Sequence, residues 1–325
     1  MADKINMVQA LNRAMDEEMD RDEDVLVMGE DVGEDGGVFR VTDGLHDKYG
    51  EERVIDTPLA ESGIVATALG MAVYGMKPIA EIQFMGFSYP AFDQIISHVS
   101  RIRNRSRGKY NAPMVIRAPY GGGIHSPEHH SESTEALYAH TPGLKVVIPS
   151  TPKDAYGLLK SAIRDPDPVC FWEPKKVYRA MKEEVPEEEH TVDIGSADIK
   201  KEGEDLTIIS WGAMLHRSLE AAEAVEDDIS VEVIDLRTIK PMDFETIEES
   251  VRKTGRAVIV HEAPQTCGVG AEISARLTED DILHLEAPIE RVTGFDTVFP
   301  MYKLESKYLP DKARIEKAVR EVYNF

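Results

Sequence analysis

The stretch Val54–Gly70, with the sequence VIDTPLAESGIVATALG, decides the fold. Its first two residues are β-branched and predict the end of a strand, and the following DTP predicts a tight turn. Apolar residues at helical spacing from Ile64 to Val73 then predict a helix. This order places the carboxylate of Glu61 in the first turn of a helix. The pattern alone favours a simple role, in which Glu61 complements the positive end of the helix dipole.

The same alternation of strands and helices continues along the chain. Short apolar runs predict strands at 25–28, 54–55, 77–82, 114–117, 144–149, 169–172, 206–211, 231–236 and 257–260. Helices are predicted between most of them, including one from Pro90 to Arg105. Strands that alternate with helices predict parallel sheets covered on both faces. We therefore expect an α/β protein with two open, mostly parallel-sheet domains, at residues 1–180 and 206–325, joined by an acidic linker at 181–205.

Composition excludes several classes of protein. The 325 residues carry a net charge of −23, which disfavours nucleic acid and anionic membranes as partners. No apolar run is long enough to cross a membrane, and the acidic N-terminus lacks a signal-peptide core, so the cytoplasm is the expected location. The two cysteines, Cys170 and Cys267, are far apart in sequence, which predicts two buried thiols and no disulfide.

The acidic residues are concentrated in two segments. Seven lie between Asp16 and Asp24, and ten lie between Met181 and Asp205. Both segments are predicted to be solvated surface. A sharper hypothesis is adaptation to a salty cytoplasm, in which screening relieves the repulsion between like charges.

Three polar clusters are candidates for chemistry. Glu30 follows a predicted strand, which is the usual place for ligands in an open α/β sheet. Glu61 begins a helix, and His125, His129 and His130 share one loop. A metal site on this loop is disfavoured because Pro127 prevents a helix from fixing the histidine spacing, so acid/base or substrate-positioning chemistry is favoured. A hydrogen bond from His125 to the backbone remains a purely structural alternative.

Seven segments in register resemble one family. They are Glu30-Asp31, DTPLAESG at 56–63, FSYPAFDQI at 87–95, HHSES at 129–133, HTPGLKVVIPSTP at 140–152, SAIRDPDPV at 161–169 and DLRTIKPMD at 235–243. Together they resemble the beta subunit of thiamine-diphosphate-dependent 2-oxo acid dehydrogenases of the pyruvate or branched-chain type, in the transketolase superfamily. The resemblance covers essentially the whole chain.

This resemblance implies roles for individual residues. Glu61 matches the glutamate that hydrogen-bonds the pyrimidine of thiamine diphosphate and favours the tautomer that activates the thiazolium ring. Glu30, Leu59 and Phe87 match positions at the cofactor, and Phe87 packs against the pyrimidine. His130 matches the histidine that helps to transfer the acyl group to a lipoyl arm by donating a proton.

The resemblance also implies partners and metals. No GDG motif, which holds the diphosphate and magnesium in the superfamily, occurs in this chain. A separate alpha subunit is therefore expected to supply most of the magnesium site. The two chains would form an alpha2-beta2 heterotetramer with the cofactor between the subunits. A dihydrolipoyl acyltransferase is expected to dock at the aromatic carboxyl terminus. The alternative interpretation is that this terminus is a frayed tail with no partner. A structural potassium site is implied at the backbone carbonyls of Met114, Ala162, Ile163, Asp165 and Asp167, although Asp167 stands where relatives often have an amide.

The remaining functional alternatives belong to different classes. The beta subunit of acetoin dehydrogenase, or of another two-subunit thiamine diphosphate enzyme, would share these motifs. A split transketolase is disfavoured by the HHSES loop. A metal-dependent hydrolase that uses the histidine loop and a non-catalytic scaffold subunit are further possibilities. The sequence leaves the identity of the 2-oxo acid open.

Overall fold

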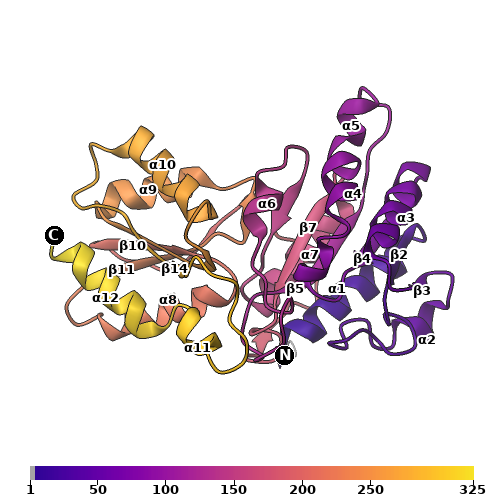
Figure 1. The fold of residues 1–325 in the computed structure, drawn as a ribbon, viewed down its shortest axis with the longest axis horizontal. Helices are drawn as coiled ribbons and strands as arrows, with labels where there is room; N and C mark the ends of the chain where they lie inside the picture. The colour runs from indigo at the N-terminus through magenta and orange to yellow at the C-terminus, as the bar shows by residue number, and fades with distance from the viewer. Residues whose placement is uncertain (1–3) are drawn as a thin grey trace.

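Two sheets lie side by side in the computed structural model, which describes residues 4–325 (Figure 1). The first sheet has seven strands in the order β12-β6-β7-β5-β4-β2-β3, and the second has five in the order β14-β13-β10-β11-β9. All neighbours in the first sheet are parallel except β12, and all in the second are parallel except β9. The predicted class, α/β with two mostly parallel sheets, is confirmed.

The first sheet is buried on both faces. Its strands are β2 (Val25–Gly29), β3 (Val54–Asp56), β4 (Lys77–Glu81), β5 (Val115–Tyr120), β6 (Lys145–Val147), β7 (Val169–Pro174) and β12 (Thr238–Lys240). Alternate residues of β2 point to opposite cores: Val25 and Val27 join one apolar cluster, and Leu26 and Met28 join the other. This burial on both sides explains why the strands read as continuous apolar runs and not as alternating patterns.

Helices cover both faces of this sheet (Figure 1). Helices α1 (Met7–Arg21) and α7 (Pro152–Arg164) pack on one face, and α3 (Glu61–Tyr74), α4 (Phe92–Ser97) and α6 (Glu135–Ala139) contribute to the other core. The start of α7 follows the sequence signal, since Thr151 caps the helix by accepting a hydrogen bond from the Asp154 amide and Pro152 occupies the first turn. The short helix α2 (Leu45–Tyr49) follows a glycine and was not predicted.

The second sheet repeats this arrangement. Its strands are β9 (Asp198–Lys201), β10 (Leu206–Ser210), β11 (Val231–Asp235), β13 (Ala257–Pro264) and β14 (Glu290–Gly294). Helices α8 (Ala213–Ala224) and α12 (Lys312–Tyr323) pack on one face, and α9 (Phe244–Thr254) and α10 (Val269–Asp281) pack on the other. Each apolar cluster contains residues from both sheets, so the two domains share their cores.

The structure revises the region predicted as a linker at 181–205. Within it, β8 (Glu183–Glu184) pairs with β1 (Lys4–Ile5), and β9 forms the antiparallel edge of the second sheet. The segment after β11 also crosses back, because β12 pairs antiparallel with β6 of the first sheet. Sequence periodicity could not reveal these edge strands, since they are two to four residues long.

Two local predictions were wrong. The predicted helix at 90–105 is broken into α4, a 3-10 turn at Val99–Arg101 and α5 (Ile102–Arg105). The side chains of Ser100 and Arg101 both donate to the Ile96 carbonyl, which competes with the helical backbone bonds. Cys170 is buried as predicted, whereas Cys267 is exposed.

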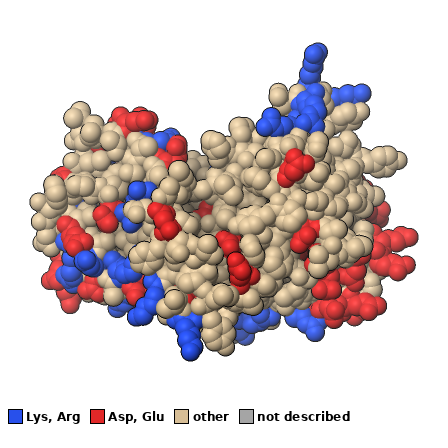
Figure 2. All heavy atoms as spheres, viewed as in Figure 1, with Lys and Arg blue, Asp and Glu red and all other residues tan. Residues whose placement is uncertain are grey.

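The acidic segments are only partly solvated. Glu18 is 2% exposed, and its carboxylate pairs with Arg164 of α7. Arg164 also pairs with Glu189, so the two acidic segments meet at one cation. Other acidic side chains gather on the surface over α2 and β3, and basic ones gather at the tip of α5 (Figure 2). Within residues 4–325 no helix combines the length and apolar character that a membrane crossing requires.

Candidate functional site

The predicted site residues lie at one edge of the first sheet. Glu30 follows β2, Glu61 begins α3 after β3, Phe87 lies in the 3-10 turn Met85–Ser88 after β4, and His130 lies in the loop after β5. Because β2, β3, β4 and β5 are parallel, all four segments emerge at the carboxyl edge of the sheet.

The DTP motif fixes the distance between the first two segments. The Asp56 carboxylate accepts a hydrogen bond of 2.6 Å from the Gly33 amide, in the loop that follows Glu30. The Thr57 amide donates to the Gly29 carbonyl at 2.8 Å. These bonds hold the turn before α3 against the end of β2, which places the Glu61 carboxylate near enough for its charge to raise the pKa of Glu30. The side chain of Leu59, in the same turn between β3 and α3, is 79% exposed.

Glu30 has two properties that are typical of a ligand-binding carboxylate, a raised pKa and, within the described part of the chain, a buried oxygen without a partner. Burial raises the pKa of its carboxyl group, and the nearby charges of Glu61 and Asp31 raise it further. Its Oε1 atom is buried and has no hydrogen-bond partner among residues 4–325. A buried acceptor without a donor is costly unless a ligand or water satisfies it.

An aromatic cluster lies on the neighbouring segments. The ring of His130 lies 4.5 Å from the ring centroid of Phe84 and 4.9 Å from that of Phe87. Its Nδ1 atom is 2.8 Å from the Glu128 carbonyl, which leaves Nε2 as the ring nitrogen free for a reacting group. The structure therefore brings Phe87 and His130 into contact.

A buried ion triad, which sequence reasoning missed, lies at the same ends of the strands. Arg117 of β5 donates to Glu81 of β4 and to both carboxylate oxygens of Glu173 of β7. Arg117 is 1% exposed and Glu173 is fully buried. Burial raises the pKa of Glu81, although the Arg117 charge opposes this effect. The only sequence signal was a charged residue at the centre or end of each apolar run.

The histidine loop does not form a metal cluster. His125 Nδ1 contacts the Tyr302 carbonyl at 2.8 Å, as the backbone-bonding alternative predicted, and His129 lies 3.9 Å from Glu132. Among the described residues, no three His, Cys, Asp or Glu side chains are grouped so that they could hold a metal ion.

The residues implied for potassium lie at the opposite, amino edge of the sheet. The Met114 carbonyl accepts from the Val169 amide at 3.0 Å, and the Ala162 carbonyl accepts from the Asp165 amide at 3.3 Å. Each of these oxygens keeps a second lone pair for a cation. Lys145 pairs with the Asp165 carboxylate, and Arg103 pairs with that of Asp167.

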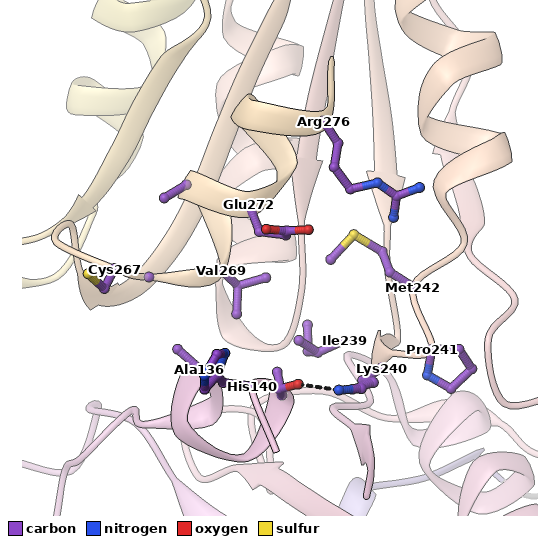
Figure 3. Close-up of a pocket in the computed structure, with 13 residues that line it drawn as sticks. Ala136, His140, Ile239, Lys240, Pro241, Met242, Cys267, Val269, Glu272 and Arg276 are labelled. Atoms are coloured by element: carbon purple, nitrogen blue, oxygen red, sulfur yellow. Dashed lines mark hydrogen bonds between the residues drawn. The ribbon is translucent and has the colours of Figure 1, made fainter. Parts of the chain in front are cut away.

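A groove of about 790 Å³ lies away from these residues, between the two domains (Figure 3). Its walls include Ala136 of α6, Val269 and Arg276 of α10, and the segment Ile239–Met242 that carries β12. Lys240 crosses the floor and donates to the Ala139 carbonyl. The groove is lined by none of the candidate-site residues Glu30, Glu61 and His130.

Comparison with known families gives the class of protein. Residues 3–181 match the family described as "Transketolase, pyrimidine binding domain", and residues 195–315 match "Transketolase, C-terminal domain". A solved structure titled "Split gene transketolase, inactive beta4 tetramer" has a TM-score of 0.81 and 25% identity to this chain, and the match covers 99% of both chains.

Closer relatives narrow the class. The chain is 55% identical to the pyruvate dehydrogenase E1 component subunit beta of Staphylococcus epidermidis and 54% identical to that of Staphylococcus aureus. Both matches cover 99% of this chain and 99% of the relative. The chain therefore belongs to the family of beta subunits of thiamine-diphosphate-dependent 2-oxo acid dehydrogenases, in the transketolase superfamily.

The residues present fit one half of thiamine diphosphate. A pyrimidine ring offers donors and acceptors to carboxylates and a flat face to an aromatic ring. The unpartnered Glu30 oxygen, the adjacent Glu61 and the half-buried Phe87 supply these groups at one edge.

Proposed function

We propose that this chain is the beta subunit of the decarboxylating component of a 2-oxo acid dehydrogenase complex, and that it acts on pyruvate. One observation carries the proposal: the neighbouring carboxylates of Glu30 and Glu61 lie at the same sheet edge as the Phe87–His130 contact, and a buried oxygen of Glu30 has no partner among residues 4–325. The family and the names of the relatives support the substrate.

In this proposal the cofactor supplies the electron sink for decarboxylation, and the chain supplies orientation and polarisation. Glu61 would accept a hydrogen bond from the pyrimidine and bias its tautomer, and Glu30 would accept a second one. A carboxylate is effective here because burial strengthens its interactions. Phe87 and Leu59 would hold the pyrimidine ring. His130 donates a proton to the lipoyl sulfur that leaves when the disulfide of the lipoyl arm opens and its other sulfur takes the acyl group.

A separate alpha subunit completes the site. It binds the diphosphate and magnesium, in an alpha2-beta2 heterotetramer located in the cytoplasm. The dihydrolipoyl acyltransferase docks at the carboxyl terminus of the beta subunit, where Phe325 is 81% exposed. Helix α12 runs to Tyr323, and the Arg256 guanidinium lies over the Tyr323 ring at 5.6 Å, so the tail is held up to its last residues.

The test is 2-oxo acid-dependent reduction of an artificial electron acceptor, with thiamine diphosphate and magnesium. The beta chain is assayed alone and co-expressed with a candidate alpha subunit. Activity in the pair alone, with preference for pyruvate, supports the proposal. Activity of the chain alone refutes the need for an alpha subunit, and turnover of acetoin but of no 2-oxo acid identifies an acetoin dehydrogenase instead.

A variant separates catalysis from scaffolding. Glu61→Gln keeps the size of the side chain but removes the charge, so we expect activity to fall by about 100-fold or more. Glu34→Gln, on the neighbouring loop and exposed, is the matched control and should retain activity. If Glu61→Gln is as active as the wild type, the chain is a scaffold and the proposal is wrong.

The proposal includes a structural potassium ion on the carbonyls of residues 114, 162, 163, 165 and 167. Potassium should then raise the melting temperature of the assembly more than sodium does at equal ionic strength. Equal melting temperatures in the two salts would remove the ion from the proposal.

A further inference from the structure

Two buried carboxylates of the second domain bind the glycine loop that precedes His130. The Glu262 carboxylate, from β13, accepts from the Gly122 amide at 2.9 Å. The Glu305 carboxylate, which begins α11 (Glu305–Tyr308), accepts from the Gly123 amide at 2.8 Å and from the His125 amide at 3.0 Å. Both glutamates are less than 5% exposed.

A buried lysine holds the same loop from the other side. Lys175, which follows β7 and is 4% exposed, donates to the carbonyls of Gly121 and His130. Its ammonium group also lies 5.5 Å from the ring of Phe84, which contacts His130. Lys175 therefore connects the first residue of the glycine loop to the backbone of the histidine.

The loop has little freedom in this arrangement. Gly121 has a φ of 77° and a Cβ there would lie 2.4 Å from a Glu262 oxygen, so no larger residue fits beside the carboxylate. At Gly86 a Cβ would lie 2.2 Å from the His129 carbonyl. The backbone of the histidine loop is thus closely packed against the aromatic turn after β4.

Among the described residues, the hydrogen bonds of both glutamates to this loop run to backbone amides and not to the His130 ring, so these groups act through the backbone. Buried charges of this kind are costly, and removal of the carboxylates would leave three loop amides without their acceptors. Burial also lowers the pKa of Lys175 to about 8, although Glu262 and Glu305 oppose this change. A fold that needed only stability could fill this space with apolar side chains.

We propose that Glu305, together with Glu262 and Lys175, positions His130, so that the second domain sets the geometry of acyl transfer to the lipoyl arm. The inference rests on the function proposed above. It assigns to the second domain a role in the active site of the same chain. Glu305 is a positioning residue, because it touches the loop and not the reacting atoms.

The test compares two rates in the reconstituted alpha–beta assembly. The first is reduction of an artificial acceptor, which needs decarboxylation only, and the second is acylation of an isolated lipoyl domain. In Glu305→Gln, whose amide can accept from the loop at only one oxygen, the ratio of the second rate to the first should fall about tenfold or more. Misplacement of a reacting group by ~1 Å can change a rate about 100-fold. Glu223→Gln, on the exposed side of α8, is the control and should leave the ratio unchanged.

A double-mutant cycle separates positioning from general loosening. His130→Ala should lower the same ratio, and the double variant Glu305→Gln/His130→Ala should be no worse than His130→Ala alone. If Glu305→Gln does not assemble, Glu305→Asp, which keeps the charge but shortens the reach, carries the same comparison. If the two substitutions lower the ratio additively, or if Glu305→Gln leaves the ratio unchanged, this inference is wrong and the proposed function is unaffected. Absence of any 2-oxo acid turnover in the wild-type pair would overturn the proposed function and this inference with it.

Discussion

The buried carboxyl group of Glu135 should make the stability of this protein depend on pH. Glu135 begins α6 and is 1% exposed, and neither of its carboxylate oxygens accepts a hydrogen bond of good geometry from residues 4–325. Burial raises its pKa to about 7 from an ordinary value of 4.5, and the charge of Glu262 adds to the effect, whereas only weak contacts with its own amide and with Trp211 lower the pKa. The folded protein thus holds a proton that the unfolded chain releases between pH 4.5 and 7.

The sign and size of the effect follow from linkage. The unfolded state binds fewer protons than the folded state in this window, so the free energy of unfolding falls as pH rises through it and levels off above pH 7. A pKa difference of about 2.5 corresponds to about 3 kcal/mol. In Glu135→Gln the side chain is neutral at every pH, so this loss should disappear.

Urea denaturation of wild type and Glu135→Gln at pH 5 and pH 8 measures the effect. The variant should gain about 2–3 kcal/mol relative to wild type between the two pH values. Glu128→Gln, on the exposed histidine loop, is the control and should stay within about 0.5 kcal/mol of wild type at both. If the difference between Glu135→Gln and wild type is the same at both pH values, the carboxyl group does not titrate as described.

Three further predictions concern stability. Arg117→Met leaves the buried carboxylates of Glu81 and Glu173 unpaired, so it should lower the free energy of unfolding by about 3–5 kcal/mol. A loss below about 1 kcal/mol in denaturant titration would mean that the triad does not stabilise the fold. Leu11→Ala removes a fully buried side chain between α1 and the sheet and should lower the same free energy by about 2–5 kcal/mol; an unchanged urea midpoint would mean that α1 is not packed there. Because the chain carries a net charge of −23, the melting temperature should rise with added sodium chloride, and a flat salt series would argue against adaptation to a salty cytoplasm.

The sequence by itself determined the class of fold and the positions of the two carboxylates, while the catalytic role proposed for them came from the family resemblance. Apolar runs that alternate with helical periods require parallel sheets with two covered faces, and β2 shows this directly, because its residues face opposite cores in turn. Glu30 and Glu61 were recognisable because strand ends and helix starts are local signals. Parallel pairing of β2 with β3 then made their proximity a geometric consequence.

Only the tertiary structure decided which distant segments support the site. The pairing of β12 with β6, and of β9 with β11, joins strands too short to show a period in the sequence. The bonds from Glu262 and Glu305 to the glycine loop join residues about 140 and 182 positions apart. Such contacts depend on how the two domains pack, and a buried glutamate at the end of one strand looks the same in sequence as an exposed one. The loop that carries His130 is therefore set by a domain whose sequence gave no sign of a role in the site.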